Sequence, residues 1–381
     1  MKKNSQKKAQ WQQWVMMAIF VAVGAICGIF MVDFIDQRAA EGASVMGERF
    51  MLLVLLLGLY VSYYLHICIH EAGHLVFGLR SGYRFSSFRI GSIIWLKENG
   101  KIVRRKYSLA GTGGQCLMAP PDMKNGKIPV VLYNLGGCIL NLLTSAVASV
   151  AYLLIPRGTM LSVLLLMFVL MGVISALTNG IPLRLGTVDN DGYNACALGK
   201  NPEAMRAFWL QLKVNEQVTK GVRLKDMPEE WFTLPADDAM KNSMVATQGV
   251  LVSNRLMDQH DFEEADRLMA HLLEIDSGII GLHRGLMICD RMYLELIRDN
   301  RKETLDGMRT KEQLRLMKAM RSFPSVVRTE YVYALLGSKD AVKAQAALTL
   351  FTRIEKTYPY PGDIRSEREL METAAKVAGA V

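Results

Sequence analysis

Four long runs of apolar residues dominate the first half of the chain, and the second half has none. The runs cover about residues 15–31, 50–79, 128–155 and 160–182. A helix needs roughly 20 apolar residues to cross the hydrocarbon core of a bilayer, so each run predicts a transmembrane helix. No small-residue cleavage site closely follows the first run, so we expect an uncleaved span rather than a signal peptide. The pattern predicts a mainly α-helical, polytopic membrane protein with about four transmembrane helices.

In residues 196–381, apolar positions recur at helical spacing with polar residues between them. Asn201-Pro202-Glu203 is a typical helix start, and Asp261 opens a helix that pairs with residues 247–259. Such pairs resemble tetratricopeptide repeats, which stack into concave binding surfaces. We therefore expect a cytoplasmic helical domain that docks a regulatory protein. Further helices are predicted at residues 279–298, 312–323, 325–336 and 341–358.

The loop at residues 80–127, between the second and third runs, carries a β-hairpin pattern. Residues 89–96 and 101–107 are β-prone and flank Glu98-Asn99-Gly100, and Asn-Gly is a strong signal for a hairpin turn. Residues 113–118, which include Gly114 and Gln115, predict a further edge strand. The cations of such a sheet can contact anionic lipid headgroups, and its edge can accept an added strand of substrate.

The net charge of +9 fits a membrane topology, and we predict no nucleic-acid partner. The loop at 80–127 holds ten Lys or Arg residues against two acids, Glu98 and Asp122. By the positive-inside rule this loop is cytoplasmic, and so are both termini. We expect an integral protein of a bacterial cytoplasmic membrane, in contact with the lipid bilayer. Lysines precede the first run and acids follow it, at Lys2, Lys3, Lys7, Lys8, Asp33, Asp36, Glu41 and Glu48.

The second run contains His70-Glu71-Ala72-Gly73-His74, an HExxH pattern. Residues four apart share one helix face, so His70 and His74 can present two imidazoles to one Zn²⁺ ion. Glu71 then stands beside the metal, where its carboxylate can take a proton from a zinc-bound water. HExxH also occurs on solvated helix faces, but an unpaired carboxylate within a membrane span is costly. The placement therefore favours a zinc site with Glu71 as the catalytic base.

His66 lies one turn before His70 and offers a third imidazole in the same row. Three residues over two helical turns span about 12 Å, which is too long for one ion to reach both ends of the row. We expect His66 to be a hydrogen-bonded neighbour of the site rather than a ligand.

A catalytic zinc site requires a third protein ligand. The fourth run ends at Asn179-Gly180-Ile181-Pro182, and Asp189-Asn190-Asp191-Gly192 follows. Asp191 is the predicted ligand, with Gly192 allowing the backbone to bend close to the metal helix. Asp189 is the alternative, and an ordinary Asn-Asp-Gly turn is what this tripeptide usually forms.

These elements together resemble the site-2 protease family of intramembrane zinc metalloproteases. That family has a core of three transmembrane helices, with HExxH on the first, G-x-x-x-N on the second and N-x-x-P…D-G at the end of the third. Here the second element reads Gly137-Cys138-Ile139-Leu140-Asn141, and the third reads Asn179 to Pro182 with Asp191-Gly192. The resemblance covers about residues 50–195. The chain departs from it at Cys138, where the family usually has Pro, and in a longer stretch before Asp191 that contains Arg184.

The resemblance implies an endopeptidase that cleaves a transmembrane protein or peptide near the cytoplasmic face. It implies that Asn141 and Gly137 line the substrate, with Asn141 holding the peptide backbone; helix packing is the other interpretation of Asn141. It also implies that Gly114 and Gln115 lie on the strand that meets the substrate.

Three domains are expected: residues 1–49 as an N-terminal helix and external loop, 50–195 as the metalloprotease core with loop 80–127, and 196–381 as the helical domain. The alternative function is a catalytically silent membrane scaffold that recruits partners through the helical domain. A transporter is disfavoured because the spans do not form paired repeats.

Overall fold

The structure is a computed structural model that describes residues 2–98, 100–107, 112–183 and 189–379. Asn99 and Arg184, which the sequence analysis singled out, lie outside the described residues, as do the N-terminal lysine side chains. The chain divides into two compact units. Unit 1 comprises Met1–Arg84, Gly113–Cys116 and Pro129–Lys200, and unit 2 comprises Phe85–Thr112, Leu117–Ile128 and Asn201–Val381.

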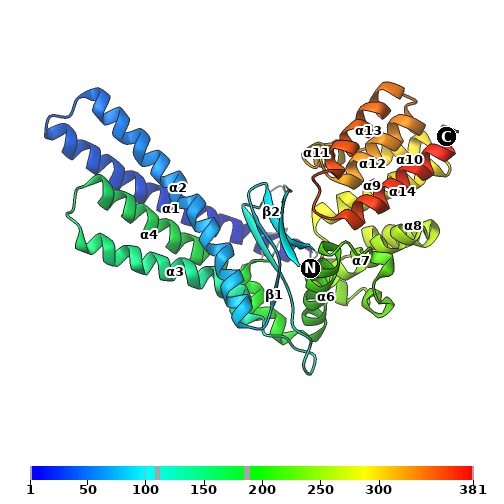
Figure 1. Ribbon diagram of the computed structural model, residues 1–381, viewed down its shortest axis with the longest axis horizontal. Helices are drawn as coiled ribbons and strands as arrows, with labels where there is room; N and C mark the ends of the chain where they lie inside the picture. Colours follow the sequence, from blue (N-terminus) through cyan, green and yellow to red (C-terminus); the bar gives the residue numbers. More distant parts are fainter. Residues whose placement is uncertain (1, 99, 108–111, 184–188, 380–381) are drawn as a thin grey trace. The chain divides into compact units, whose positions relative to one another are not determined.

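Unit 1 is a bundle of long helices: α1 (Lys2–Ala40), α2 (Val45–Arg80), α3 (Val131–Leu154) and α4 (Met160–Gly180) (Figure 1). All four are long and apolar enough to cross a membrane. The prediction of a mainly helical chain with four such helices is confirmed at this level. Helices α1 and α2 extend beyond the apolar runs that predicted them, because polar ends continue the helix without adding to the apolar stretch.

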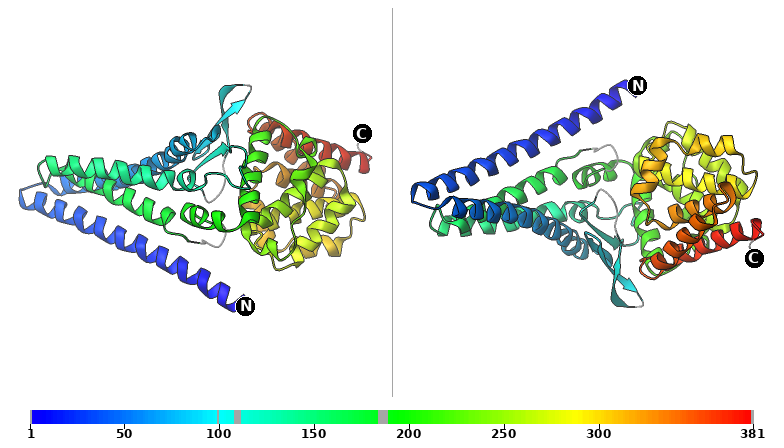
Figure 2. Two further views of the ribbon diagram at one scale, coloured as in Figure 1. Left: turned by 90° about the horizontal axis from the view of Figure 1, so that it is seen from below. Right: turned by 90° about the horizontal axis from the view of Figure 1, so that it is seen from above.

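The bundle is held at one end by an apolar cluster and capped by polar side chains. Met31, Phe34, Leu55 and Met167 bury one another between α1, α2 and α4. At the start of α2, the hydroxyl of Ser44 accepts a hydrogen bond from the backbone N–H of Gly47, and Thr159 and Ser162 form a capping box on α4. In Figure 2, α1 diverges from the other three helices toward its N-terminus.

A four-stranded sheet has the order β3-β2-β1-β4. Its strands are β1 (Arg84–Ile90), β2 (Ile93–Glu98), β3 (Lys101–Lys106) and β4 (Gly114–Ala119). The β2–β3 hairpin is confirmed, with Glu98 opposite Lys101, and so is an edge strand at β4. The single strand predicted at residues 89–96 is wrong, because Gly91 takes a positive φ of 57° and turns the chain between β1 and β2.

The sheet packs through its apolar face within unit 2. Ile94 and Leu96 of β2 are buried against Tyr360, with Val103, Tyr107 and Tyr358 around them. Residues Phe85–Thr112 and Leu117–Ile128 therefore belong to the same unit as the C-terminal helices. Residues 80–84 of the loop 80–127 and Gly113–Cys116, which include the start of β4, belong to unit 1.

The rest of unit 2 is an array of helices, which we call the C-terminal helices. The predicted start at Asn201 is confirmed, since its side chain accepts from the N–H of Ala204. The predicted start at Asp261 is confirmed in the same way by its bond from Glu264. The final helix was not predicted. The main members are α6 (Pro202–Thr219), α7 (Ser243–Gln259), α8 (Phe262–Glu274), α9 (Gly281–Ile297), α10 (Lys302–Met308), α11 (Lys311–Ala319), α12 (Pro324–Val332), α13 (Ala341–Glu355) and α14 (Pro361–Val377).

Candidate metal centre

Two histidines of α2 and one aspartate of α5 (Asp191–Ala197) converge within unit 1. The Nε2 atoms of His70 and His74 lie 3.1 Å apart. Oδ2 of Asp191 lies 3.0 Å from Nε2 of His70 and 3.4 Å from Nε2 of His74. Among the residues that the structure describes, this is the one group of three His, Cys, Asp or Glu side chains whose ligand atoms lie within 4.8 Å of one another.

The three separations fit a tetrahedral metal site. Ligand atoms bound to zinc at 2.0–2.1 Å stand about 3.3 Å apart in a tetrahedron, and the observed edges are 3.0, 3.1 and 3.4 Å. Two imidazoles and one carboxylate are also a donor set that zinc takes in catalytic sites. The side chain of Asp191 is 23% exposed, so this face of the cluster is accessible.

The side chain of Asn190 fixes the position of Asp191. Its Oδ1 accepts from the backbone N–H of Tyr193 and of Leu183. Its Nδ2 donates to the carbonyls of Thr178 and Ile181 at the end of α4. All hydrogen-bonding capacity of this buried amide is used, so it ties the first turn of α5 to the end of α4. Asp191, the next residue, is thereby held toward α2.

Gly192 makes a different close contact from the approach to the metal helix that we expected. A Cβ atom at this position would lie 2.0 Å from the carbonyl oxygen of Gly180. The glycine therefore allows α5 to approach the end of α4, and not the metal helix α2. Asp189 is half-buried and stands outside the group of three ligand candidates.

Paired glycines bring α3 against the histidine helix. A Cβ at Gly73 would lie 2.3 Å from the carbonyl oxygen of Gly136, and a Cβ at Gly137 would lie 2.5 Å from the ring of His70. The backbones of α2 and α3 thus meet at the site because neither carries a side chain there. The structure places Gly137 against the imidazole of His70, and its predicted contact with substrate stays a prediction.

Glu71 is buried next to β4. A Cβ at Gly114 would lie 2.5 Å from Cγ and 2.6 Å from Oε1 of Glu71, so the strand leaves room for this carboxylate only because residue 114 is glycine. Gln115, which follows on the strand, is half-buried. The predicted base and the predicted substrate strand therefore adjoin one another in unit 1.

Hydrogen bonds orient the imidazole of His74. Its Nδ1 lies 2.8 Å from the backbone carbonyl of Tyr133, which can only accept. Nδ1 therefore carries the proton, and the lone pair of Nε2 faces Asp191 and His70. The hydroxyl of Tyr133 donates to the carbonyl of Cys116 on β4, and its ring stacks on Tyr83 at 4.5 Å.

Asn141, His66 and Ser175 orient the imidazole of His70. The amide of Asn141 is fully buried, and its two ends lie 3.1 Å from Nδ1 of His66 and 3.4 Å from Nδ1 of His70. Nε2 of His66 donates to the carbonyl of Phe168 at 2.8 Å, so in a neutral ring Nδ1 accepts and requires the NH₂ group of Asn141. The structure places the amide the other way round, with Oδ1 toward His66 and Nδ2 toward His70 and the hydroxyl of Ser175, 2.8 Å away. Reversing the amide, as this tautomer of His66 requires, turns the amide oxygen toward Nδ1–H of His70 and toward Ser175.

This arrangement leaves the lone pair of both Nε2 atoms directed at the same point, as a metal ligand set requires. His66 takes part as the hydrogen-bonded neighbour that we expected, and Asn141 is already engaged by two histidines. The predicted binding of the substrate backbone by Asn141 stays a prediction.

Sequence reasoning missed Asn190, Tyr133, Gly73 and Ser175. The signal for Asn190 was present, because Asn directly before Asp-Gly is a good helix N-cap. Tyr133 and Ser175 act through a backbone carbonyl and a hydroxyl that no spacing rule connects to HExxH.

Comparison of the chain with known protein families, with curated proteins and with solved structures finds no match. The geometry of the site is therefore the basis for assigning a function.

Proposed function

We propose that this protein is an intramembrane zinc endopeptidase that hydrolyses a peptide bond of a membrane-embedded protein or peptide near the cytoplasmic face. The observation that carries the proposal is the convergence of His70, His74 and Asp191 beside the buried carboxylate of Glu71. Both histidines lie on a helix long and apolar enough to cross a membrane. Burying ionisable side chains within a membrane span is energetically costly, so those that occur there usually serve a function.

Exposed apolar side chains support insertion of the four long helices into a bilayer. Leu57 is 59% exposed, Val147 72% and Leu154 80%. Soluble proteins rarely expose large contiguous apolar surfaces, whereas lipid tails cover them. With the charge distribution of the loops, this supports an integral protein of a cytoplasmic membrane with both termini in the cytoplasm.

Each residue of the site has a role in the proposed hydrolysis. His70, His74 and Asp191 would hold Zn²⁺, which polarises a carbonyl group and makes water acidic enough to attack at neutral pH. Glu71 accepts the proton of the attacking water and passes it to the leaving amine. Its carboxylate is buried, so the proton transfer takes place away from bulk water.

The strand β4 is the proposed site for the substrate backbone. It is an edge strand, and residues at its start adjoin Glu71. A peptide that adds to this edge has its backbone hydrogen-bonded and extended, which exposes the bond to be cut. Gly114 and Gln115 would contact the substrate there, with Gly137 and Asn141 on α3.

The proposal is tested by comparing new protein N-termini in membranes of cells that produce the wild-type chain or the Glu71→Gln variant. We expect N-termini that map within or beside transmembrane segments in the wild-type sample alone. Both proteins, purified in detergent, should contain one zinc per chain, because glutamine at position 71 leaves the three ligands intact. A His70→Ala, His74→Ala double variant should contain none.

Zinc retained by the double variant would refute the site. Wild-type protein that holds zinc but yields no N-terminus beyond those of Glu71→Gln would instead favour a silent scaffold.

A further inference from the structure

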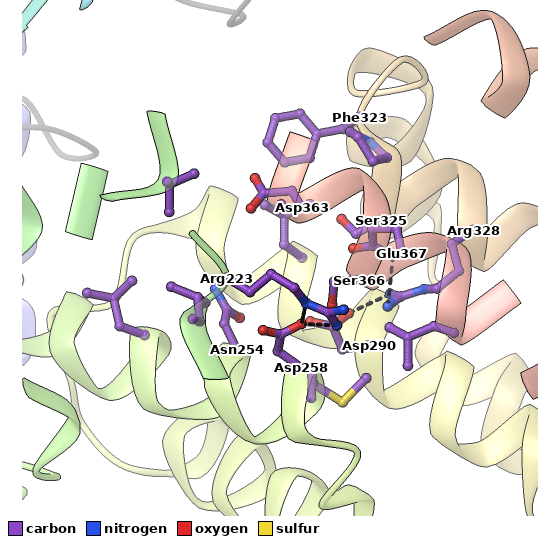
Figure 3. A pocket seen from close by; sticks show the side chains of 18 of the residues that line it. Arg223, Asn254, Asp258, Asp290, Phe323, Ser325, Arg328, Asp363, Ser366 and Glu367 are labelled. Atoms are coloured by element: carbon purple, nitrogen blue, oxygen red, sulfur yellow. Dashed lines mark hydrogen bonds and ion pairs between the residues drawn. The ribbon is translucent and has the colours of Figure 1, made fainter. Parts of the chain in front are cut away.

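A cavity of about 260 Å³ lies within the C-terminal helices (Figure 3). Its walls come from α6, α7, α9, α12 and α14, together with the turn at Arg223 and Leu224. Pockets for drug-sized molecules measure roughly 300–1,000 Å³, so this cavity suits a smaller ligand, such as one long side chain. Six charged residues line it: Arg223, Asp258, Asp290, Arg328, Asp363 and Glu367.

Both arginines of the cavity are already held by carboxylates. Arg223 donates from Nε and Nη2 to Oδ1 of Asp258, at 3.0 and 2.6 Å, and its other side is bound to Glu369. Arg328 is 1% exposed and donates to Asp290, and its Nη1 lies 3.2 Å from Oε2 of Glu367. The dashed lines of Figure 3 mark the pair of Arg223 with Asp258 and the pairs that Arg328 makes. Neither guanidinium is therefore available to an incoming anion.

The carboxylates outnumber the arginines. Four acids and two arginines line the cavity, which leaves a formal charge of −2 when all are ionised. Within the described part of the chain, no hydrogen bond or ion pair involves the side chain of Asp363, which is subject to burial and to the charge of Asp258. Oε2 of Glu367 has no hydrogen bond beyond its ion pair with Arg328. Burial raises the pKa of Asp363 and of Glu367 to about 7 each. Asp363 thus lacks a cation that would stabilise its charged form, and Glu367 shares the one guanidinium of Arg328 with Asp290.

A metal ion is a poor candidate for that cation. Within the described residues, the one trio of carboxylate, histidine or cysteine side chains with converging ligand atoms is the site on α2 and α5. The acids of this cavity come from three helices, α7, α9 and α14, and their ligand atoms form no such trio. Apolar and aromatic side chains also line the cavity, among them Leu251, Phe323 and Tyr358. Such walls suit an aliphatic stem and the face of a flat organic cation.

We propose that this cavity binds an organic cation, a guanidinium or ammonium group on an aliphatic stem, and that Asp363 is its carboxylate partner. Such a cation restores charge balance among the acids and places its stem against the apolar wall. Its source is either an arginine or lysine side chain of a peptide or a free amine of the same size. The residues that line the cavity all belong to unit 2 and are separate from the proposed zinc site.

Calorimetric titration of the full chain in detergent at pH 8 tests the proposal with three probes. These are N-acetyl-arginine methylamide, agmatine, and N-acetyl-citrulline methylamide as the neutral isostere of the first. We expect the arginine probe or agmatine to bind, and the citrulline probe to bind at least about tenfold more weakly, since hydrogen bonds between charged groups contribute the difference. Binding of the arginine probe identifies a peptide side chain as the source, and binding of agmatine alone identifies a free amine.

Two variants connect binding to the cavity. Asp363→Asn should weaken binding of the cation about tenfold or more, whereas Glu372→Gln, which removes an exposed carboxylate from the same helix, should leave it unchanged. Phe323→Leu should also weaken binding, and it leaves every carboxylate in place. The proposal is overturned if no cationic probe binds at millimolar concentration, if citrulline binds as well as arginine, or if Asp363→Asn binds like the wild type.

Discussion

Gly114→Ala offers a sharp test of how β4 and Glu71 work together. The added Cβ would lie 2.5 Å from Cγ of Glu71, whereas carbon atoms in ordinary contact stand about 3.5 Å apart. The Glu71 side chain must therefore shift by about 1 Å. A displacement of that size in a reacting group costs about 100-fold in rate, or about 2.7 kcal/mol of transition-state stabilisation. The three ligand candidates are untouched, so zinc content should not change.

The assay is the rate of cleavage of a substrate identified from the N-terminus comparison, with zinc measured on the same preparation. Gly113→Ala is the matched control, because its Cβ would meet only the flexible tip of Ile67, at 2.9 Å. We expect this control to retain most of the activity. Wild-type rates in Gly114→Ala would refute the placement of Glu71, and loss of zinc in that variant would show that the substitution acts on the metal site instead.

Three further predictions concern the ligands and the C-terminal helices. Asn141→Ala should weaken zinc binding about 10- to 100-fold in competition with a chelator, because the variant no longer fixes the ring of His70; unchanged affinity with lost cleavage would favour a substrate role. Asp191→Ala should lose zinc while Asp189→Ala keeps it, and the reverse result would exchange the two assignments. Burial raises the pKa of Asp363 and Glu367 to about 7, so the folded protein holds protons there that the unfolded chain releases above about pH 4. Stability should therefore fall as pH rises from about 4 to 7. Asp363→Asn should raise the melting temperature by about 2–4 °C at pH 8 and leave it unchanged below pH 4, and equal shifts at both values would contradict this.

The elements that could be predicted from sequence are those with a local cause. The apolar runs account for the four long helices, and Asn201 and Asp261 account for two helix starts through side chains that cap the next turn. Glu98 and Lys101 pair across a two-residue hairpin for the same kind of reason. In each case the signal lies within a few residues of the structure that it specifies.

The missed turn at Gly91 and the missed helix α14 also have local causes, but the sequence signal for each is weaker. The turn at Gly91 was missed because the β-prone run continues through it, and only the positive φ of 57° separates β1 from β2. Helix α14 was missed because its charged residues mask the apolar face formed by Ile364, Leu370 and Met371. Several of these charged residues, such as Glu367, point into the fold and bind arginines that lie far away in the sequence.

At the candidate site, the three ligand residues could be predicted from the sequence. The contacts that position and orient these ligands could not. His70 and His74 follow from helical spacing, and Asp191 from the need for a third ligand. The close approach of Gly73 to Gly136 depends on how two distant helices cross. The contact of Asn141 with both His66 and His70 also requires α3 to be in place. Such contacts are decided by tertiary packing, which a spacing pattern does not contain.

The central claim is tested most directly by measuring zinc content and cleavage on the same detergent-purified samples of the wild-type chain and of Glu71→Gln. The account predicts one zinc per chain in both proteins and cleavage of the membrane substrate by the wild type alone. Cleavage by a zinc-free wild-type protein, or equal cleavage by the Glu71→Gln variant, would contradict it.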